Sequence, residues 1–175
     1  MILLKKFLQK QKNAKIIYKG DNIMKKFIEQ KFHIVSEGWS DSFNGTCIVI
    51  NYKNKTFRGK CYVHPEDNKK KSYLFGATIA YKRAVCKALI YEIEDTKKQF
   101  KIYQNLLTAC QSTKGWDPKE KSAKIFYRQF NILARRLNSL QNEKIELEDD
   151  IYFSIKQRDI VTNAIDRKKK QNKTK

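Results

Sequence analysis

One stretch, Phe57–Tyr91, constrains the fold of this chain more than any other, because it passes from a strand pattern through a proline turn into a helix pattern. Residues 55–63 alternate between polar and apolar side chains, which is typical of a strand with one buried face. Four alanines then recur at three- or four-residue spacing and share one helical face: Ala77, Ala80, Ala84 and Ala88. Such small side chains allow a helix to lie close against a sheet.

The alternation assigns the side chains of this strand to two faces. The polar face holds Thr56, Arg58, Lys60 and Tyr62, and the core face holds Phe57, Gly59, Cys61 and Val63. The strand is predicted to end at residues 64–67, His-Pro-Glu-Asp, because proline lacks the N–H that a sheet needs.

Upstream residues complete the predicted sheet. Met24–Phe32 has the apolar spacing of a short helix, and His33–Glu37 and Thr46–Tyr52 alternate like strands. The polar run 51–55 predicts a hairpin turn between the second and third strands. Residues 24–91 are therefore predicted to form an α-β-β-β-α domain whose three-stranded antiparallel sheet packs on a helix.

The second half of the chain has helical patterns. The pattern that begins at Tyr73 continues to Ser112, either as one long helix or as two with a kink. Asp117 and Pro118 then suit the cap and first position of another helix. Its apolar residues follow four-three spacing and are predicted to pack on Ile93–Cys110: Phe126, Phe130, Leu133, Leu137 and Leu140. The predicted fold class is α+β, with a C-terminal helical bundle or hairpin over residues 92–166.

The two ends of the chain are rich in lysine. Residues 167–175 are predicted to be a disordered basic tail. Residues 1–23 have two explanations, which both stay open. They form a basic helix over Leu3–Lys12, or they are a translated leader before a start at Met24, because codons for residues 19–24 can contain a bacterial ribosome-binding sequence.

Charge limits the partners that the chain can attract. The sequence has 38 Lys and Arg against 18 Asp and Glu, a formal net charge of +20, so polyanions are favoured. AT-rich coding would explain part of this excess. The four cysteines form no close pair, which favours reduced thiols and a cytoplasmic location in a bacterial host cell. The apolar segment at the N-terminus is too short to span a membrane.

Two resemblances rest on the strand-to-helix region. The string H-P-E-D followed by G-x-x-I-A-x-x-R-A-x-x-K-A, residues 64–67 and 76–88, resembles small uncharacterised proteins of Firmicute phages. The order α-β-β-β-α over 24–91 also resembles a double-stranded-RNA-binding domain. The lysines of that family's helix start, K-K-x-A-K, are replaced by other residues at 77–81 when the alanines are matched. Lys69, Lys70 and Lys71 precede the helix and are predicted to take over this role at its N-terminus.

An enzymatic site would have to use His64, Glu66 and Asp67, where a histidine lies close to two carboxylates. The sequence offers no second metal-ligand cluster, no glycine-rich phosphate loop and no nucleophile motif. A turn with a capping acid explains these residues without catalysis. We therefore predict no catalytic residues, no metal and no cofactor.

The predicted nucleic-acid-binding residues combine basic side chains with aromatic rings that could stack on bases. They are Lys53, Lys55, Arg58, Lys60, Tyr62, Lys69, Lys70, Lys71, Arg135 and Arg136. The competing interpretation is that the aromatic rings fill the core and the lysines only solvate the surface.

The leading functional prediction is a phage-type accessory protein that binds RNA or DNA, or a host nucleoprotein, without catalysis. Inhibition of a CRISPR effector is its narrower form, because a basic surface can compete for the effector's guide or target. One alternative is a metal-dependent enzyme acting on nucleic acid. The other is a helical module that dimerises through the leucine seam, the row of four-three spaced residues Phe126, Phe130, Leu133, Leu137 and Leu140. The sequence leaves the oligomeric state open.

Overall fold

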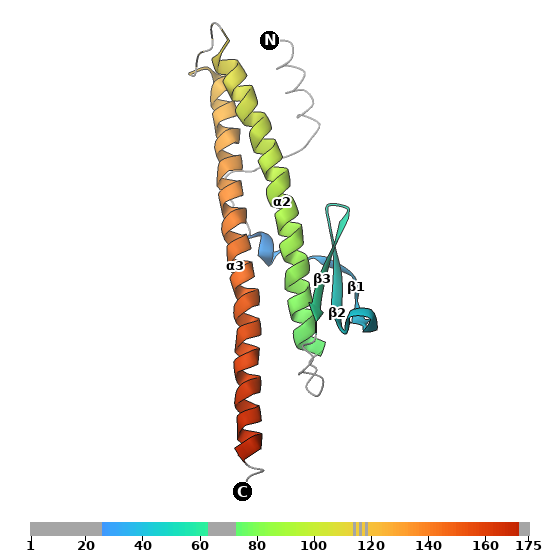
Figure 1. The fold of residues 1–175 in the computed structure, drawn as a ribbon. Coiled ribbons are helices and arrows are strands. Elements are labelled where there is room, and N and C mark those ends of the chain that lie inside the picture. The colour runs from blue at the N-terminus through green and yellow to red at the C-terminus, as the bar shows by residue number, and fades with distance from the viewer. Residues whose placement is uncertain (1–25, 63–72, 114, 116, 118, 172–175) are drawn as a thin grey trace.

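The computed structural model describes residues 26–62, 73–113, 115, 117 and 119–171 (Figure 1). The elements in chain order are the 3-10 turn η1 (Phe27–Glu29), strand β1 (His33–Ser40), the 3-10 turn η2 (Asp41–Phe43), strands β2 (Gly45–Tyr52) and β3 (Lys55–Tyr62), and helices α2 (Tyr73–Gln111) and α3 (Lys121–Gln171). An antiparallel sheet is thus followed by two long helices, which confirms the predicted α+β class.

The sheet has the order β1-β2-β3, and both of its pairings are antiparallel. The predicted hairpin between β2 and β3 is confirmed and turns at Lys53 and Asn54, whose φ angles are 49° and 59°. Two successive positive φ angles match a type I′ turn, whose twist suits two paired strands. The pairing of β1 with β2 shifts register between Ile34 and Ser36.

Helix α2 covers the inner face of the sheet, as the alanine spacing predicted. Ala80, Ala84 and Ala88 are fully buried, and Phe57 and Cys61 belong to the same core or pack against it. At Gly59, a Cβ atom would overlap the backbone of Ala80, so only glycine lets β3 approach α2 this closely. Small residues on both elements therefore set the distance between helix and sheet.

Helices α2 and α3 pack against each other as an antiparallel hairpin (Figure 1). The predicted partner of the leucine seam is confirmed, because Phe130 lies 4.7 Å from Phe100 and Phe126 lies 5.8 Å from Tyr103 between ring centroids. Farther along α3, Leu140 and Leu147 join the same core as the sheet. Helix α2 is one unbroken helix that crosses the predicted domain boundary at residues 91 and 92.

The predicted helix Met24–Phe32 is wrong, because the described part of that range holds only the single turn η1. The backbone is already extended at Gln30, and the N–H of Ile28 donates to the side chain of Glu143 at 3.1 Å. Phe27 is nevertheless fully buried, and its ring centroid lies 5.3 Å from that of Phe32. Tertiary contacts hold this segment without a helix.

Both ends of α3 differ from the prediction. The helix begins at Lys121, while Asp117 accepts a 2.8 Å hydrogen bond from the N–H of Lys119 in the preceding turn. Pro118 lies outside the described residues. At the other end the backbone is helical through Gln171, so residues 167–171 are not disordered as predicted, and residues 172–175 lie outside the described residues.

Candidate nucleic-acid interface

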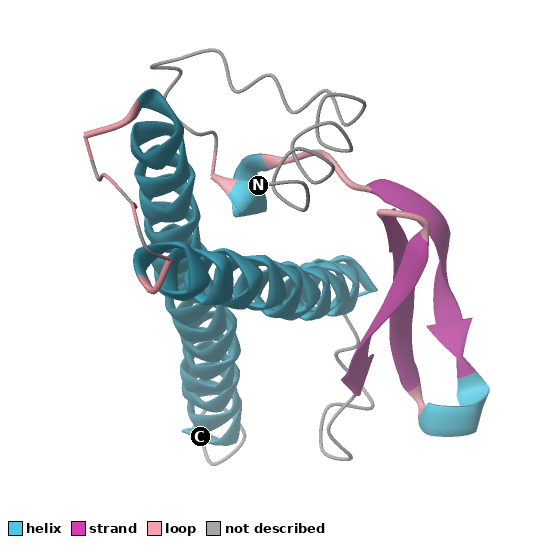
Figure 2. Ribbon diagram, turned by 90° about the horizontal axis from the view of Figure 1, so that it is seen from above, coloured by secondary structure: helices cyan, strands magenta, loops and turns pink. Residues whose placement is uncertain are grey.

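Strand β3 presents a basic and aromatic set of side chains on the face of the sheet that points away from α2. Arg58 and Tyr62 are exposed, Tyr62 to 59%, and Lys60 is half-buried. Both long helices lie on the other side of the sheet (Figure 2). The predicted grouping of Arg58, Lys60 and Tyr62 on one face therefore agrees with the structure.

Two basic side chains of α2 lie along the same strand. β3 is an edge strand. Arg58 and Lys60 form non-hydrogen-bonded pairs with residues of β2, so their own backbone N–H and C=O groups point away from β2. The carbonyl oxygen of Arg58 accepts a 2.7 Å hydrogen bond from Lys87 Nζ, and that of Lys60 accepts a 2.6 Å hydrogen bond from the Arg83 guanidinium. Arg83 and Lys87 are thereby held beside the cations of β3.

We call Arg58, Lys60, Tyr62, Arg83 and Lys87 the basic surface. Arg83 and Lys87 are not among the binding residues predicted from the sequence. Their four-residue spacing puts them on one side of α2, and each directly precedes a buried alanine of the face that contacts the sheet. This position next to the alanine face was the signal that would have found them.

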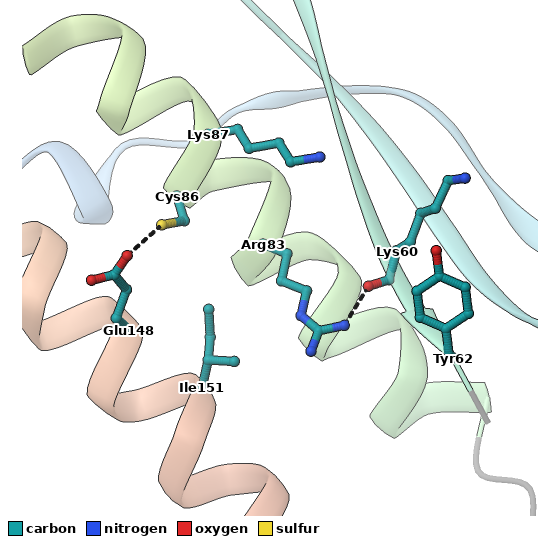
Figure 3. Close-up of a pocket in the computed structure, with 7 residues that line it drawn as sticks. All are labelled: Lys60, Tyr62, Arg83, Cys86, Lys87, Glu148 and Ile151. Atoms are coloured by element: carbon teal, nitrogen blue, oxygen red, sulfur yellow. Dashed lines mark hydrogen bonds between the residues drawn. The ribbon is translucent and has the colours of Figure 1, made fainter. Parts of the chain in front are cut away.

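A cavity of about 450 Å³ opens beside the basic surface, between β3, α2 and α3 (Figure 3). Its lining consists of Lys60, Tyr62, Arg83, Cys86, Lys87, Glu148 and Ile151. Arg83 and Lys87 of α2 line one side together with Lys60 and Tyr62 of β3, where the Lys60 side chain points away from α3, and α3 contributes Glu148 and Ile151 to the other side. The cavity thus has opposite charges on facing sides.

Glu148 and Cys86 face each other in this cavity. The Cys86 thiol donates to Glu148 Oε1 at 3.9 Å, and Lys144 Nζ lies 2.8 Å from Glu148 Oε2. Burial, together with the nearby Glu148 carboxylate, raises the pKa of the Cys86 thiol. Cys86 is therefore a protonated donor at neutral pH.

Two other predicted binding residues form ion pairs around Glu92, a buried carboxylate of α2. Lys53 Nζ lies 2.7 Å from Glu92 and 3.0 Å from Asp95, and Arg136 lies 3.7 Å from Glu92. Burial by itself would lower the pKa of Lys53, but the hydrogen bonds to Glu92 and Asp95 raise it. These two cations join the hairpin turn to both helices and do not belong to the basic surface.

The remaining predicted residues are scattered. Lys55 Nζ lies 4.2 Å from the ring centroid of Tyr91, and Arg135 is exposed on α3. The predicted helix-entrance lysines, Lys69, Lys70 and Lys71, and the residues of the enzyme alternative, His64, Glu66 and Asp67, lie outside the described residues.

The described part of the chain shows no cluster of metal ligands, no disulfide and no helix that could span a membrane. No group of three or more His, Cys, Asp or Glu side chains there is arranged to hold a metal ion. All four cysteines are free, and two of them, Cys61 and Cys86, are buried. None of the described helices has an apolar stretch long enough to cross a bilayer.

Comparisons of the chain with protein-family models, with curated proteins and with solved structures gave no match.

Proposed function

We propose that this protein binds single-stranded nucleic acid through the basic surface. The observation that carries the proposal is the juxtaposition of an exposed aromatic ring, Tyr62, with four cations from two different elements. Cations neutralise phosphates, and an exposed ring offers a stacking platform for a base. The formal charge of +20 adds long-range attraction for any polyanion.

The geometry favours a single strand over a duplex. Stacking on Tyr62 requires a base with an open face, which only an unpaired or splayed nucleotide offers. The cations lie along one extended edge strand, so they follow a linear backbone and do not enter a groove. A host nucleoprotein with an exposed strand, such as the guide or target of a CRISPR effector, presents the same phosphates to this surface.

Salt dependence tests the proposal directly. If the four cations of the basic surface each contact one phosphate, affinity for a labelled twelve-residue uridine oligonucleotide should fall about fiftyfold between about 50 and 200 mM salt. Fluorescence anisotropy measures this affinity. A salt-independent affinity, or no binding at low salt, would refute the proposed function.

A pull-down from a bacterial lysate, with and without nuclease treatment, separates the two forms of the proposal. Partners that disappear after nuclease treatment indicate binding through nucleic acid alone. A nucleoprotein that stays bound after treatment indicates that its protein surface or its protected strand is engaged.

A further inference from the structure

We infer that the cavity beside the basic surface receives one unstacked guanine base of the bound strand, with Glu148 as the acceptor that recognises it. This inference rests on the proposed function, because the strand must first be held by the cations. It adds two assignments to that function: guanine is the preferred base, and Glu148 is the residue that recognises it.

The dimensions and walls of the cavity suit a nucleotide. Its volume of about 450 Å³ lies within the range of small-molecule sites, which is roughly 300–1,000 Å³. The cations Lys60, Arg83 and Lys87 stand on the side of the basic surface, where the phosphates would lie. Ile151, next to Glu148 on α3, supplies an apolar side chain for contact with a base, and Tyr62 lies at the β3 end of the cavity.

The Glu148 carboxylate, on the α3 side of the cavity, determines which chemical groups of a ligand can bind there. An ionised carboxylate only accepts hydrogen bonds, so the part of the ligand that reaches Glu148 must donate them. Glu148 can accept further hydrogen bonds besides those from Cys86 and Lys144, because two carboxylate oxygens provide about four acceptor sites. The contact with Cys86 is a long 3.9 Å hydrogen bond from a weak S–H donor, which an N–H donor would replace readily.

Among the four bases, guanine matches such an acceptor best. Its Watson–Crick edge carries two adjacent donors, N1–H and N2–H, which a carboxylate accepts together. Adenine and cytosine place a ring-nitrogen acceptor beside their amino group, and uracil flanks its single N–H with two carbonyl oxygens. Each of these acceptors would face the Glu148 carboxylate and repel it.

The test compares hexanucleotides that differ at one position. Labelled UUUGUU, UUUAUU, UUUCUU and UUUUUU, as RNA and as the DNA equivalents with thymine, are titrated with the full chain and followed by fluorescence anisotropy. We expect the guanine-containing strand to bind about tenfold more tightly than the other three. The Glu148→Gln variant should reduce this preference to less than about twofold. The comparison of RNA with DNA shows whether the ribose 2′-hydroxyl or the thymine methyl group contributes.

Glu146→Gln is the matched control. Glu146 lies on the same helix, makes an exposed ion pair with Lys26 and does not line the cavity, so the substitution changes the charge equally. Glu146→Gln should keep the guanine preference, and thermal unfolding should show both variants folded.

The outcomes distinguish a failure of this inference from a failure of the proposed function. Equal binding of all four hexanucleotides would overturn the inference and leave the proposed function intact. A guanine preference that survives in Glu148→Gln would also overturn it, since another group would then read the base. If no hexanucleotide binds, the proposed function and the inference fail together.

Discussion

The hydroxyl of Tyr52 donates a 2.8 Å hydrogen bond to the carboxylate of Glu92, and this contact joins the end of β2 to the middle of α2. Glu92 also receives Lys53 and Arg136, so one buried carboxylate connects the hairpin turn, α2 and α3. A buried carboxylate is tolerated only when it is paired and hydrogen-bonded. The arrangement therefore makes Tyr52 a stabilising residue.

Removal of the Tyr52 hydroxyl should lower stability. Tyr52→Phe leaves Glu92 paired with its two cations, so we expect a loss of about 1–2 kcal/mol in the free energy of unfolding. Urea denaturation followed by circular dichroism measures it. Tyr91→Phe is the control, because the Tyr91 ring packs near Phe57 at a centroid distance of 5.7 Å and its hydroxyl is not the donor to Glu92. Equal losses in the two variants would contradict the prediction.

The same contact predicts a dependence on pH. Burial, the hydrogen bond to Glu92 and its negative charge raise the pKa of Tyr52 above its ordinary value of 10.0. The folded state therefore keeps the phenol proton at a pH where the unfolded state has lost it. The stabilisation is fully present below about pH 10 and declines as the pH rises above that value. The stability difference between wild type and Tyr52→Phe should thus shrink between pH 8 and pH 11, and a constant difference would argue against the raised pKa.

Gly59→Ala should destabilise the fold by about 2–4 kcal/mol, because the added methyl group meets the backbone of α2 and not a flexible side chain. Thermal unfolding measures the loss. Gly38→Ala is a matched control, since Gly38 also lies on a strand and a Cβ there would have nothing within 4 Å. We expect a change within about 0.5 kcal/mol for the control.

Substitution of Arg58 and Lys60 together by Ala should weaken binding of a uridine oligonucleotide by about 1–3 kcal/mol at low salt, with little change in stability. Lys124→Ala with Arg128→Ala removes the same two residue types from exposed positions of α3 and serves as the control. If the control pair weakens binding equally, net charge and not the basic surface is responsible. If deletion of residues 167–175 abolishes binding while the Arg58 and Lys60 pair has no effect, the C-terminal segment is the binding element.

The cysteines should differ in their reaction with iodoacetamide. Burial raises the pKa of Cys61 and Cys86, which lowers the fraction of reactive thiolate at pH 8. Cys47 and Cys110 are only half-buried. We expect Cys61 and Cys86 to be alkylated more slowly, as followed by mass spectrometry of proteolytic peptides, and uniform rates in the folded protein would contradict this.

The features that sequence reasoning predicted correctly depend on short-range patterns. The strand alternation of residues 55–62, the turn at Lys53 and Asn54, and the alanine face of α2 can all be recognised within a few residues. The seam of α3 follows from its four-three spacing, and its partner follows from the order of the helices. The fold class could therefore be predicted without a relative.

The failures depend on contacts between residues far apart in the sequence. The Ile28 N–H finds Glu143, 115 residues away, so the helix predicted at Met24–Phe32 does not form. Lys53 and Arg136 had the charge and position expected of phosphate ligands, but both pair with Glu92. The spacing of residues along a helix does not show that Glu92 lies close to either cation. Only the three-dimensional arrangement shows which cations remain on the basic surface.

The hydrogen bonds from Lys87 and Arg83 to β3 also restrict how the sheet could be extended by another chain. A strand added beside β3 would need the carbonyl oxygens of Arg58 and Lys60, which already accept these two side chains. An unprotected edge strand is a template for pairing with other molecules. At the opposite edge, β1 has a register shift between Ile34 and Ser36 that interrupts regular pairing. The two cations thus protect one edge of the sheet against intermolecular β-pairing, and an irregular strand forms the other.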